Sequence, residues 1–118
     1  MIWGLMPSPP IFKKSNNVAV LAKDVDSARR FYSDVLQMTI TSDSSTGIEF
    51  RNDDSHFYVM QNENRATVLE FFVNDLEAAR DHLVQNGCKV IRWEGKGKDC
   101  YIQDPFGTVF NLWETDDL

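Results

Sequence analysis

The side chains best suited to metal binding or nucleophilic chemistry are scarce in this chain. Two histidines, His56 and His82, and two cysteines, Cys88 and Cys100, are present. A catalytic divalent metal needs about three protein ligands around one point, and the cysteines lack CxxC spacing. His82 falls within a predicted helix as a surface residue, whereas His56 begins a predicted strand. Cys100 has no matched histidine and acid to make it a nucleophile.

One glycine-rich segment, EGKGK at residues 94–98, resembles a phosphate loop only superficially. Phosphate loops end in GKS or GKT and lead into a helix, but this segment lacks that ending and precedes a predicted strand. We interpret it as a mobile lid. Either Lys96 or Lys98 contacts an anionic ligand there, or both lysines are simply solvated.

The elements that must position these side chains occur twice. The segment VLAKDVDSARRFY returns as FFVNDLEAARDHL, with Asp24 matched to Asp75 at an offset of 51 residues. Each copy is an apolar strand, an acidic helix start and a short amphipathic helix. Because neither copy can bury its sheet face alone, we expect function to lie between the two halves.

The pattern along the chain predicts the order βαβββ in each half. The first strand covers residues 12–22, and Ala28, Phe31, Tyr32 and Val35 form the buried stripe of the helix that follows. Short strands fill residues 39–61. The second copy has a strand at 68–73, a helix at 76–85 ending at Asn86-Gly87, and the strands CKVIRW, DCYIQ and VFNLW. Residues 1–11 are predicted to be an extended arm. Residues 12–118 are one domain, with modules at about 12–62 and 66–116.

Composition narrows the classes of partner. Of 118 residues, 42% are hydrophobic, which is enough for a core. Acidic residues number 18 against 12 basic ones, giving a net charge of −6, and this argues against nucleic-acid binding. Apolar runs fall far short of a bilayer span, and the N-terminus does not have the pattern of a signal peptide. We expect a cytoplasmic protein without membrane contacts.

Two further segments carry a family resemblance: FYSDVLQM after the first helix start and QDPFGTVFNLWE near the end. With the βαβββ order, they resemble the vicinal oxygen chelate superfamily, which includes glyoxalase I, extradiol dioxygenases, and fosfomycin and bleomycin resistance proteins. The resemblance covers residues 17–114. It implies an α+β fold in which tandem βαβββ modules form a curved, cup-shaped mixed sheet with helices on the convex face. It also implies a ligand in the cup and a homodimer.

The resemblance also implies where a metal would be bound. Members that do metal chemistry use a histidine on each module's first strand and a glutamate on its last strand. Here Asn17, Val68 and Asn111 occupy three of these places, and the fourth falls near Val59, Met60 or Gln61, where no acid is available. We therefore expect no cofactor and no metal ligand. The alternative is an atypical metal site built from His56, Glu70 and an asparagine.

If these positions point into the cup, strand alternation assigns their neighbours. Glu70 then lies inside a partly apolar cup, where it is a candidate general base or the partner of a cationic ligand. The parity of residues 56–61 cannot be assigned. The candidate ligand-binding residues are Asn17, Leu21, His56, Tyr58, Val68, Phe72, Trp93, Tyr101, Asn111 and Trp113.

Mixed aromatic and polar residues are typical of a small-molecule pocket. We predict a metal-independent binding protein of the glyoxalase/bleomycin resistance type that sequesters an aromatic or cationic compound. The alternative is a glyoxalase- or dioxygenase-like enzyme, a lyase or isomerase, that uses either the atypical metal site or Glu70 as a base. The sequence leaves open whether the protein is an enzyme.

Overall fold

The computed structural model describes residues 9–118, apart from the side chain of Asn52, so most of the predicted arm lies outside the described residues. The order of elements is the predicted βαβββ pattern, repeated. Module 1 contains β1 (Phe12–Ala22), α1 (Val25–Arg30), the π-helical turn η2 (Phe31–Val35), β2 (Ile40–Asp43), β3 (Gly47–Asn52) and β4 (Ser55–Gln61). Module 2 contains β5 (Ala66–Val73), α2 (Leu76–Gln85), β6 (Lys89–Trp93), β7 (Cys100–Gln103) and β8 (Val109–Glu114).

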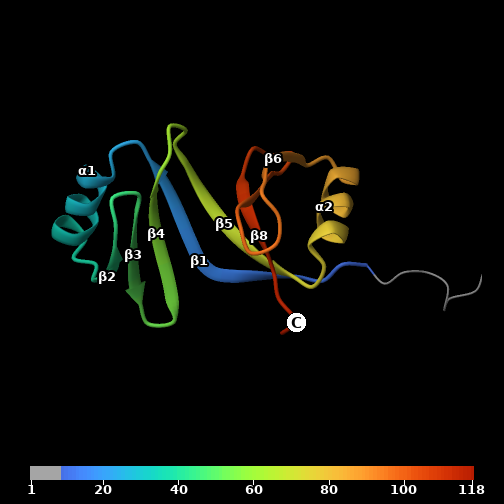
Figure 1. Ribbon diagram of the computed structural model, residues 1–118, viewed down its shortest axis with the longest axis horizontal. Coiled ribbons are helices and arrows are strands. Elements are labelled where there is room, and N and C mark those ends of the chain that lie inside the picture. The colour runs from blue at the N-terminus through green and yellow to red at the C-terminus, as the bar shows by residue number, and fades with distance from the viewer. Residues whose placement is uncertain (1–8) are drawn as a thin grey trace, which may run out of the picture.

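All eight strands form one sheet in the order β2-β3-β4-β1-β5-β8-β7-β6. In each module the first strand pairs in parallel with the last, β1 with β4 and β5 with β8. The modules meet where β1 and β5 pair antiparallel. Figure 1 shows α1 and α2 at opposite ends of the curved sheet. The predicted α+β fold class, an open mixed sheet of two βαβββ modules, is confirmed.

Equivalent aspartates start the two helices, as the repeat predicts. Asp24 Oδ1 accepts a hydrogen bond of 3.0 Å from the Ser27 backbone N–H, and Asp75 Oδ1 accepts one of 3.0 Å from Ala78. Each bond satisfies an N–H group that the first helical turn leaves unpaired. Helix α2 ends at Gln85, and Gly87 two residues later has a φ of 96°, the left-handed conformation expected of a glycine just past a helix C-terminus.

The buried stripe predicted for the first helix is correct at Ala28 and Tyr32 and wrong at Phe31 and Val35. Ala28 and Tyr32 pack against the core beneath α1, but Phe31 and Val35 are 49% and 63% exposed. The cause at Val35 is the π-helical turn η2, in which the Leu36 N–H bonds to the Phe31 carbonyl five residues earlier. This wider turn moves Val35, at its end, away from the 3.6-residue period on which the prediction rested.

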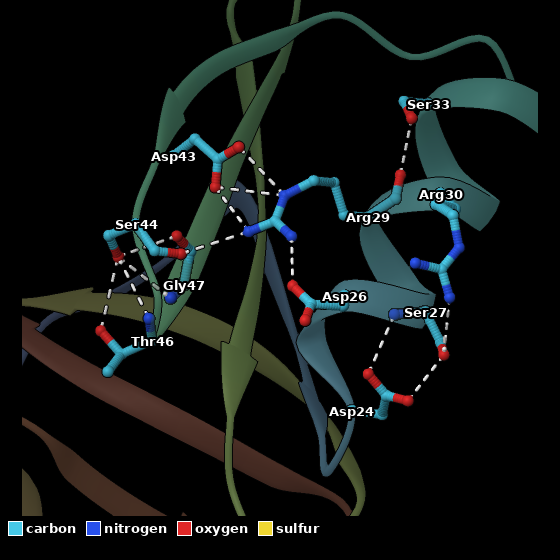
Figure 2. A network of polar contacts seen from close by, with 10 residues as sticks. All are labelled: Asp24, Asp26, Ser27, Arg29, Arg30, Ser33, Asp43, Ser44, Thr46 and Gly47. Atoms are coloured by element: carbon cyan, nitrogen blue, oxygen red, sulfur yellow. Dashed lines mark hydrogen bonds and ion pairs between the residues drawn. The ribbon is translucent and has the colours of Figure 1, made fainter.

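Arg29 fastens α1 to the edge strand β2 (Figure 2). Its guanidinium bonds both carboxylate oxygens of Asp43, with Nη2 to Oδ1 at 2.7 Å, and also contacts Asp26. The Ser44 hydroxyl accepts a bond from the Gly47 N–H in the turn that follows. A short strand held by charged side chains is poorly suited to pairing with another chain. This network therefore protects one edge of the sheet.

The core divides between the two faces of the sheet. On the helix-covered face, module 1 buries Val25, Ile48, Phe50 and Val59, and module 2 buries Val73, Leu76, Ala79, Cys100, Ile102, Phe110 and Leu112. A third cluster of Leu21, Val68 and Tyr101 lies on the concave face. Because Phe57 and Val59 pack with the module 1 core, the alternate residues of β4 point into the cup. No described helix is long and apolar enough to cross a membrane.

Candidate functional site

A pocket of about 370 Å³ opens on the concave face where the two modules meet. Four β-strands that surround the module junction, β1, β4, β5 and β8, contribute side chains, and the start of β7 closes the far wall. The lining combines aromatic, aliphatic and acidic residues. They are Asn17, Val18, Ala19, Tyr58, Met60, Val68, Leu69, Glu70, Phe72, Asp99, Tyr101, Asn111 and Trp113.

Asn17 lines this pocket and lies in a β-bulge of β1. On β1, Lys14 pairs with Phe71 of β5 and Val18 pairs with Leu69, so three residues of β1 face a single residue, Glu70. Within the bulge, the hydroxyl of buried Ser15 accepts a 2.8 Å bond from the Asn17 N–H. A bulge disrupts the strand ladder locally, and this one sets Asn17 against Glu70 of β5.

The Asn17 amide connects the strands on either side of β1. Its Nδ2 donates to Glu70 Oε1 on β5 at 3.0 Å, and its Oδ1 accepts from the His56 backbone N–H on β4 at 3.2 Å. One amide therefore bridges module 1 and module 2. On the other side of Glu70, Asn111 of β8 accepts the Cys100 N–H at 2.8 Å through Oδ1.

The lining contains two acids, Glu70 and Asp99, and no lysine or arginine. Burial raises the pKa of Asp99 above its usual value, although Arg92 opposes this shift with Nε 3.8 Å from Oδ2. The pocket walls therefore present negative charge within a mostly apolar surface.

A second polar cluster adjoins the pocket on β3 and β4. Glu49 lies opposite Tyr58 in the strand register and accepts a 2.8 Å hydrogen bond from Thr41. That bond lowers the pKa of Glu49, and neighbouring His56 adds to the effect. His56 Nδ1 is buried 3.2 Å from Glu49 Oε2, and His56 Nε2 lies 3.1 Å from Arg51 Nη2. Burial, then the Glu49 charge, raises the pKa of Tyr58.

Most of the predicted site residues line the pocket, namely Asn17, Tyr58, Val68, Glu70, Phe72, Tyr101, Asn111 and Trp113. Leu21 is buried beneath it, packed with Val68 and Tyr101, and His56 belongs to the adjoining polar cluster. Whether these residues bind a ligand stays a prediction.

Trp93, a predicted ligand-binding residue, is not among the residues that line the pocket. It packs against the module 2 core, and the Arg80 guanidinium lies 5.0 Å from its ring centroid. The reason is a bulge in β6, where Val90 pairs with Ile102 but Arg92 pairs with Tyr101. The extra residue reverses the alternation, so Trp93 turns to the helix-covered face.

Five lining residues were not among the predicted site residues, namely Val18, Ala19, Met60, Leu69 and Asp99. Asp99 stands two residues before Tyr101, and that spacing on a strand predicts a shared face. Met60 bears the same relation to Tyr58, but the parity of β4 could not be assigned from the pattern alone.

The residues at the implied metal positions do not fit a divalent metal. The side-chain oxygens of Asn17 and Asn111 accept backbone N–H groups, and Val68 has no donor atom. The fourth position was expected between Val59 and Gln61. The register instead places Tyr58 there, because it pairs with Ala19 on β1 as Asn111 pairs with Glu70 on β5. Within residues 9–118, no three side chains of His, Cys, Asp or Glu come together as a metal site.

Fold and pocket together define a class of protein with two βαβββ modules around one concave site. The chain belongs to the Glyoxalase/Bleomycin resistance protein/Dioxygenase superfamily, whose family profile matches residues 14–112. No curated protein sequence matches the chain significantly.

Solved structures similar to this chain include extradiol dioxygenases. Homoprotocatechuate 2,3-dioxygenase from Brevibacterium fuscum, in an anaerobic complex with 3,4-dihydroxyphenylacetate, aligns with a TM-score of 0.66 at 18% identity over 90% of this chain and 37% of its own. An extradiol ring-cleaving dioxygenase from B. fuscum aligns with a TM-score of 0.64 at 20% identity over 93% and 34%. The chain thus spans about a third of these enzymes, and at such identities the likeness shows the fold.

Proposed function

We propose that this protein is a metal-independent binder of small aromatic cations and sequesters them in the concave pocket. The pocket lining carries this proposal, because Glu70 and Asp99 face a space walled by aromatic rings with no lysine or arginine to neutralise them. Carboxylates in a partly apolar site favour a cation, and aromatic faces attract one as well. The aromatic residues are Tyr58, Phe72, Tyr101 and Trp113.

Calorimetric titration and thermal-shift measurements with small aromatic cations test this function. Each cation is compared with a neutral and an anionic analogue of the same ring. We expect the cations alone to raise the melting temperature, because a ligand that binds only the folded state stabilises it. A protein that binds none of the cations, or prefers the anions, contradicts the proposal.

Replacing Glu70 locates the binding. Glu70→Gln keeps the shape of the side chain but removes its charge, and we expect it to weaken cation affinity about tenfold, the scale of one charge-assisted hydrogen bond. Glu63→Gln makes the same chemical change at an exposed position outside the pocket. It should leave the affinity within about twofold of the unaltered protein.

An enzymatic role is the second candidate, because Glu70 is positioned by Asn17 inside the pocket as a general base would be. The similar structures are ring-cleaving dioxygenases. Metal analysis of the gently purified protein separates the possibilities. Stoichiometric iron, manganese, nickel or zinc would favour a dioxygenase- or glyoxalase-like enzyme. Metal-free protein that turns over a ligand, and loses turnover in Glu70→Gln, would favour a lyase or isomerase.

A further inference from the structure

The orientation of the Asn17 side chain is fixed by what surrounds it. The His56 backbone N–H can only donate, so Asn17 must direct its oxygen toward β4. Its amide nitrogen then faces Glu70 Oε1. Rotating the amide by half a turn would set two donors together on β4 and two acceptors together on β5. Both polar ends of Asn17 are therefore committed to the protein.

This arrangement determines which groups the pocket offers to a ligand. Glu70 Oε1 is bonded to Asn17, and within the described residues no side chain bonds Oε2. Asn111 Oδ1 is bonded to the Cys100 N–H, so its amide nitrogen is the part left for a ligand. The hydroxyl groups of Tyr58 and Tyr101 and the indole N–H of Trp113 are further neutral donors in the lining. The charged side chains of the lining are the two acids, Glu70 and Asp99, so the pocket favours a ligand with charged N–H donors.

Other charged and titratable groups surround Glu70 on the neighbouring strands. Its charge contributes to the raised pKa of Tyr58 on β4, and β8 adds only neutral Asn111 beside it. Further groups around the pocket are Lys13 on β1, Glu49 and Arg51 on β3, His56 on β4, Asp99 and Tyr101 at β7, and Arg92 and Glu94 beside Asp99.

We propose that Asn17 is a positioning residue that holds Glu70 so that the pocket selects aryl-alkyl cations with N–H donors over quaternary ammonium ions. This inference rests on the proposed function and narrows its ligand class. A quaternary ammonium carries the same charge and is held by aromatic faces alone, whereas a primary ammonium also donates charge-assisted hydrogen bonds to an oriented carboxylate. Orientation by Asn17 matters only for the second kind of contact.

Benzylammonium and benzyltrimethylammonium form the matched probe pair, since they share one ring, one linker and one charge. Calorimetric titration of the unaltered protein should give at least about tenfold tighter binding of benzylammonium, the scale of one or two charge-assisted bonds. Equal affinity, or preference for the trimethyl compound, would overturn the inference and leave the proposed function standing. If neither probe binds, the result contradicts both this inference and the proposed function.

A double-mutant cycle then tests whether Asn17 acts through Glu70. Asn17→Ala should weaken benzylammonium binding about fivefold and change benzyltrimethylammonium binding less than about twofold, since only the former uses the oriented oxygen. In the Glu70→Gln background, Asn17→Ala should have almost no further effect. Asn16→Ala, at an exposed neighbour in the same bulge, is the control and should behave as the unaltered protein.

A purely structural role for Asn17 predicts a different pattern. In that case Asn17→Ala would weaken both probes equally, and its effect would persist with Gln at position 70. Melting temperatures of all variants verify that they fold. Should Asn17→Ala fail to fold, the probe preference of the unaltered protein and of Glu70→Gln still decides the inference, because Glu70→Gln should abolish the preference for benzylammonium.

Discussion

At the scale of single residues, the pocket contains an acidic side chain whose burial lowers the stability of the folded protein. Asp99 is half-buried near Glu94, and burial raises its pKa despite the partial compensation from Arg92. A carboxylate is retained here although an amide of the same size would avoid the cost of burying charge. Residues kept at the expense of stability are typical of binding sites.

Asp99→Asn should therefore stabilise the protein and weaken its binding of cations. A raised pKa in the folded state favours folding most below the ordinary value of 3.8, and this contribution is lost as pH rises through the folded-state value. We expect Asp99→Asn to raise the free energy of unfolding by about 0.5 kcal/mol or less at pH 7, because solvent and Arg92 screen the charge. At pH 3 the substitution should leave the free energy of unfolding unchanged.

Urea unfolding at the two pH values measures this difference, and Asp116→Asn, at an exposed position near the C-terminus, serves as the control. A variant less stable than the unaltered protein at pH 7 would mean that the pairing of Asp99 with Arg92 outweighs its burial. The site would then contain no destabilising acid at this position.

At the scale of elements, local signals predicted regular structure well and irregular structure poorly. Helix α2 has the predicted bounds because Asp75 starts it and Gly87 ends it with capping chemistry visible in the sequence. The π-helical turn η2 and the bulge in β6 leave no comparable signal, and these two irregularities explain why the prediction misplaced Val35 and Trp93.

The bulge in β1, unlike the two irregularities above, did not lead the prediction to misplace a residue. The resemblance predicted that Asn17 points into the cup, and its side chain does line the pocket. Alternation from Val18 along a regular strand gives the same face. The hydrogen bonds of Asn17 to β4 and β5 depend on the backbone shift and could not be derived from spacing.

The glycine that ends α2 should be more sensitive to substitution than the glycine of the β6–β7 loop. Gly87 and Gly97 both have positive φ, 96° and 76°. A Cβ at position 87 would lie 3.2 Å from Pro105 Cγ, whereas one at position 97 meets nothing within 4 Å. Gly97→Ala should cost about 1 kcal/mol from backbone strain alone, and Gly87→Ala should cost more. If chemical denaturation gives the same loss of unfolding free energy for both variants, then the Pro105 ring can shift away from the new Cβ at no energetic cost.

At the scale of the whole molecule, the exposed apolar side chains suggest how two copies associate. Phe31, Val35 and Leu36 cluster on the π-helical turn, each about half exposed or more. We propose a homodimer in which this turn is covered. Sedimentation velocity should give a dimer for the unaltered protein and a monomer for Val35→Glu. Val84→Glu, at an exposed position of α2, should leave the dimer intact. A monomeric unaltered protein contradicts the proposal.

The antiparallel pairing of β1 with β5 makes one sheet of the two modules and should make their unfolding cooperative. Seven residue pairs connect these strands, from Phe12 with Val73 to Leu21 with Ala66, and the pocket spans the same junction. If the modules unfold together, damage to the core of one must destabilise the other by the same amount.

Val59→Ala tests this coupling, because Val59 is fully buried in module 1 while Trp93 and Trp113 report from module 2. In a Trp3→Phe background, tryptophan fluorescence then follows only β6 and β8. We expect Val59→Ala to lower the free energy of unfolding by about 2 kcal/mol, the cost of a cavity in a tightly packed core. Unfolding curves followed by fluorescence and by circular dichroism should both give this value. Val73 is fully buried in module 2, and Val73→Ala should shift the unfolding transitions seen by both signals to a similar extent. A fluorescence transition that Val59→Ala leaves unmoved would mean that module 2 folds without module 1, and a site shared by the modules would then assemble only after both had folded.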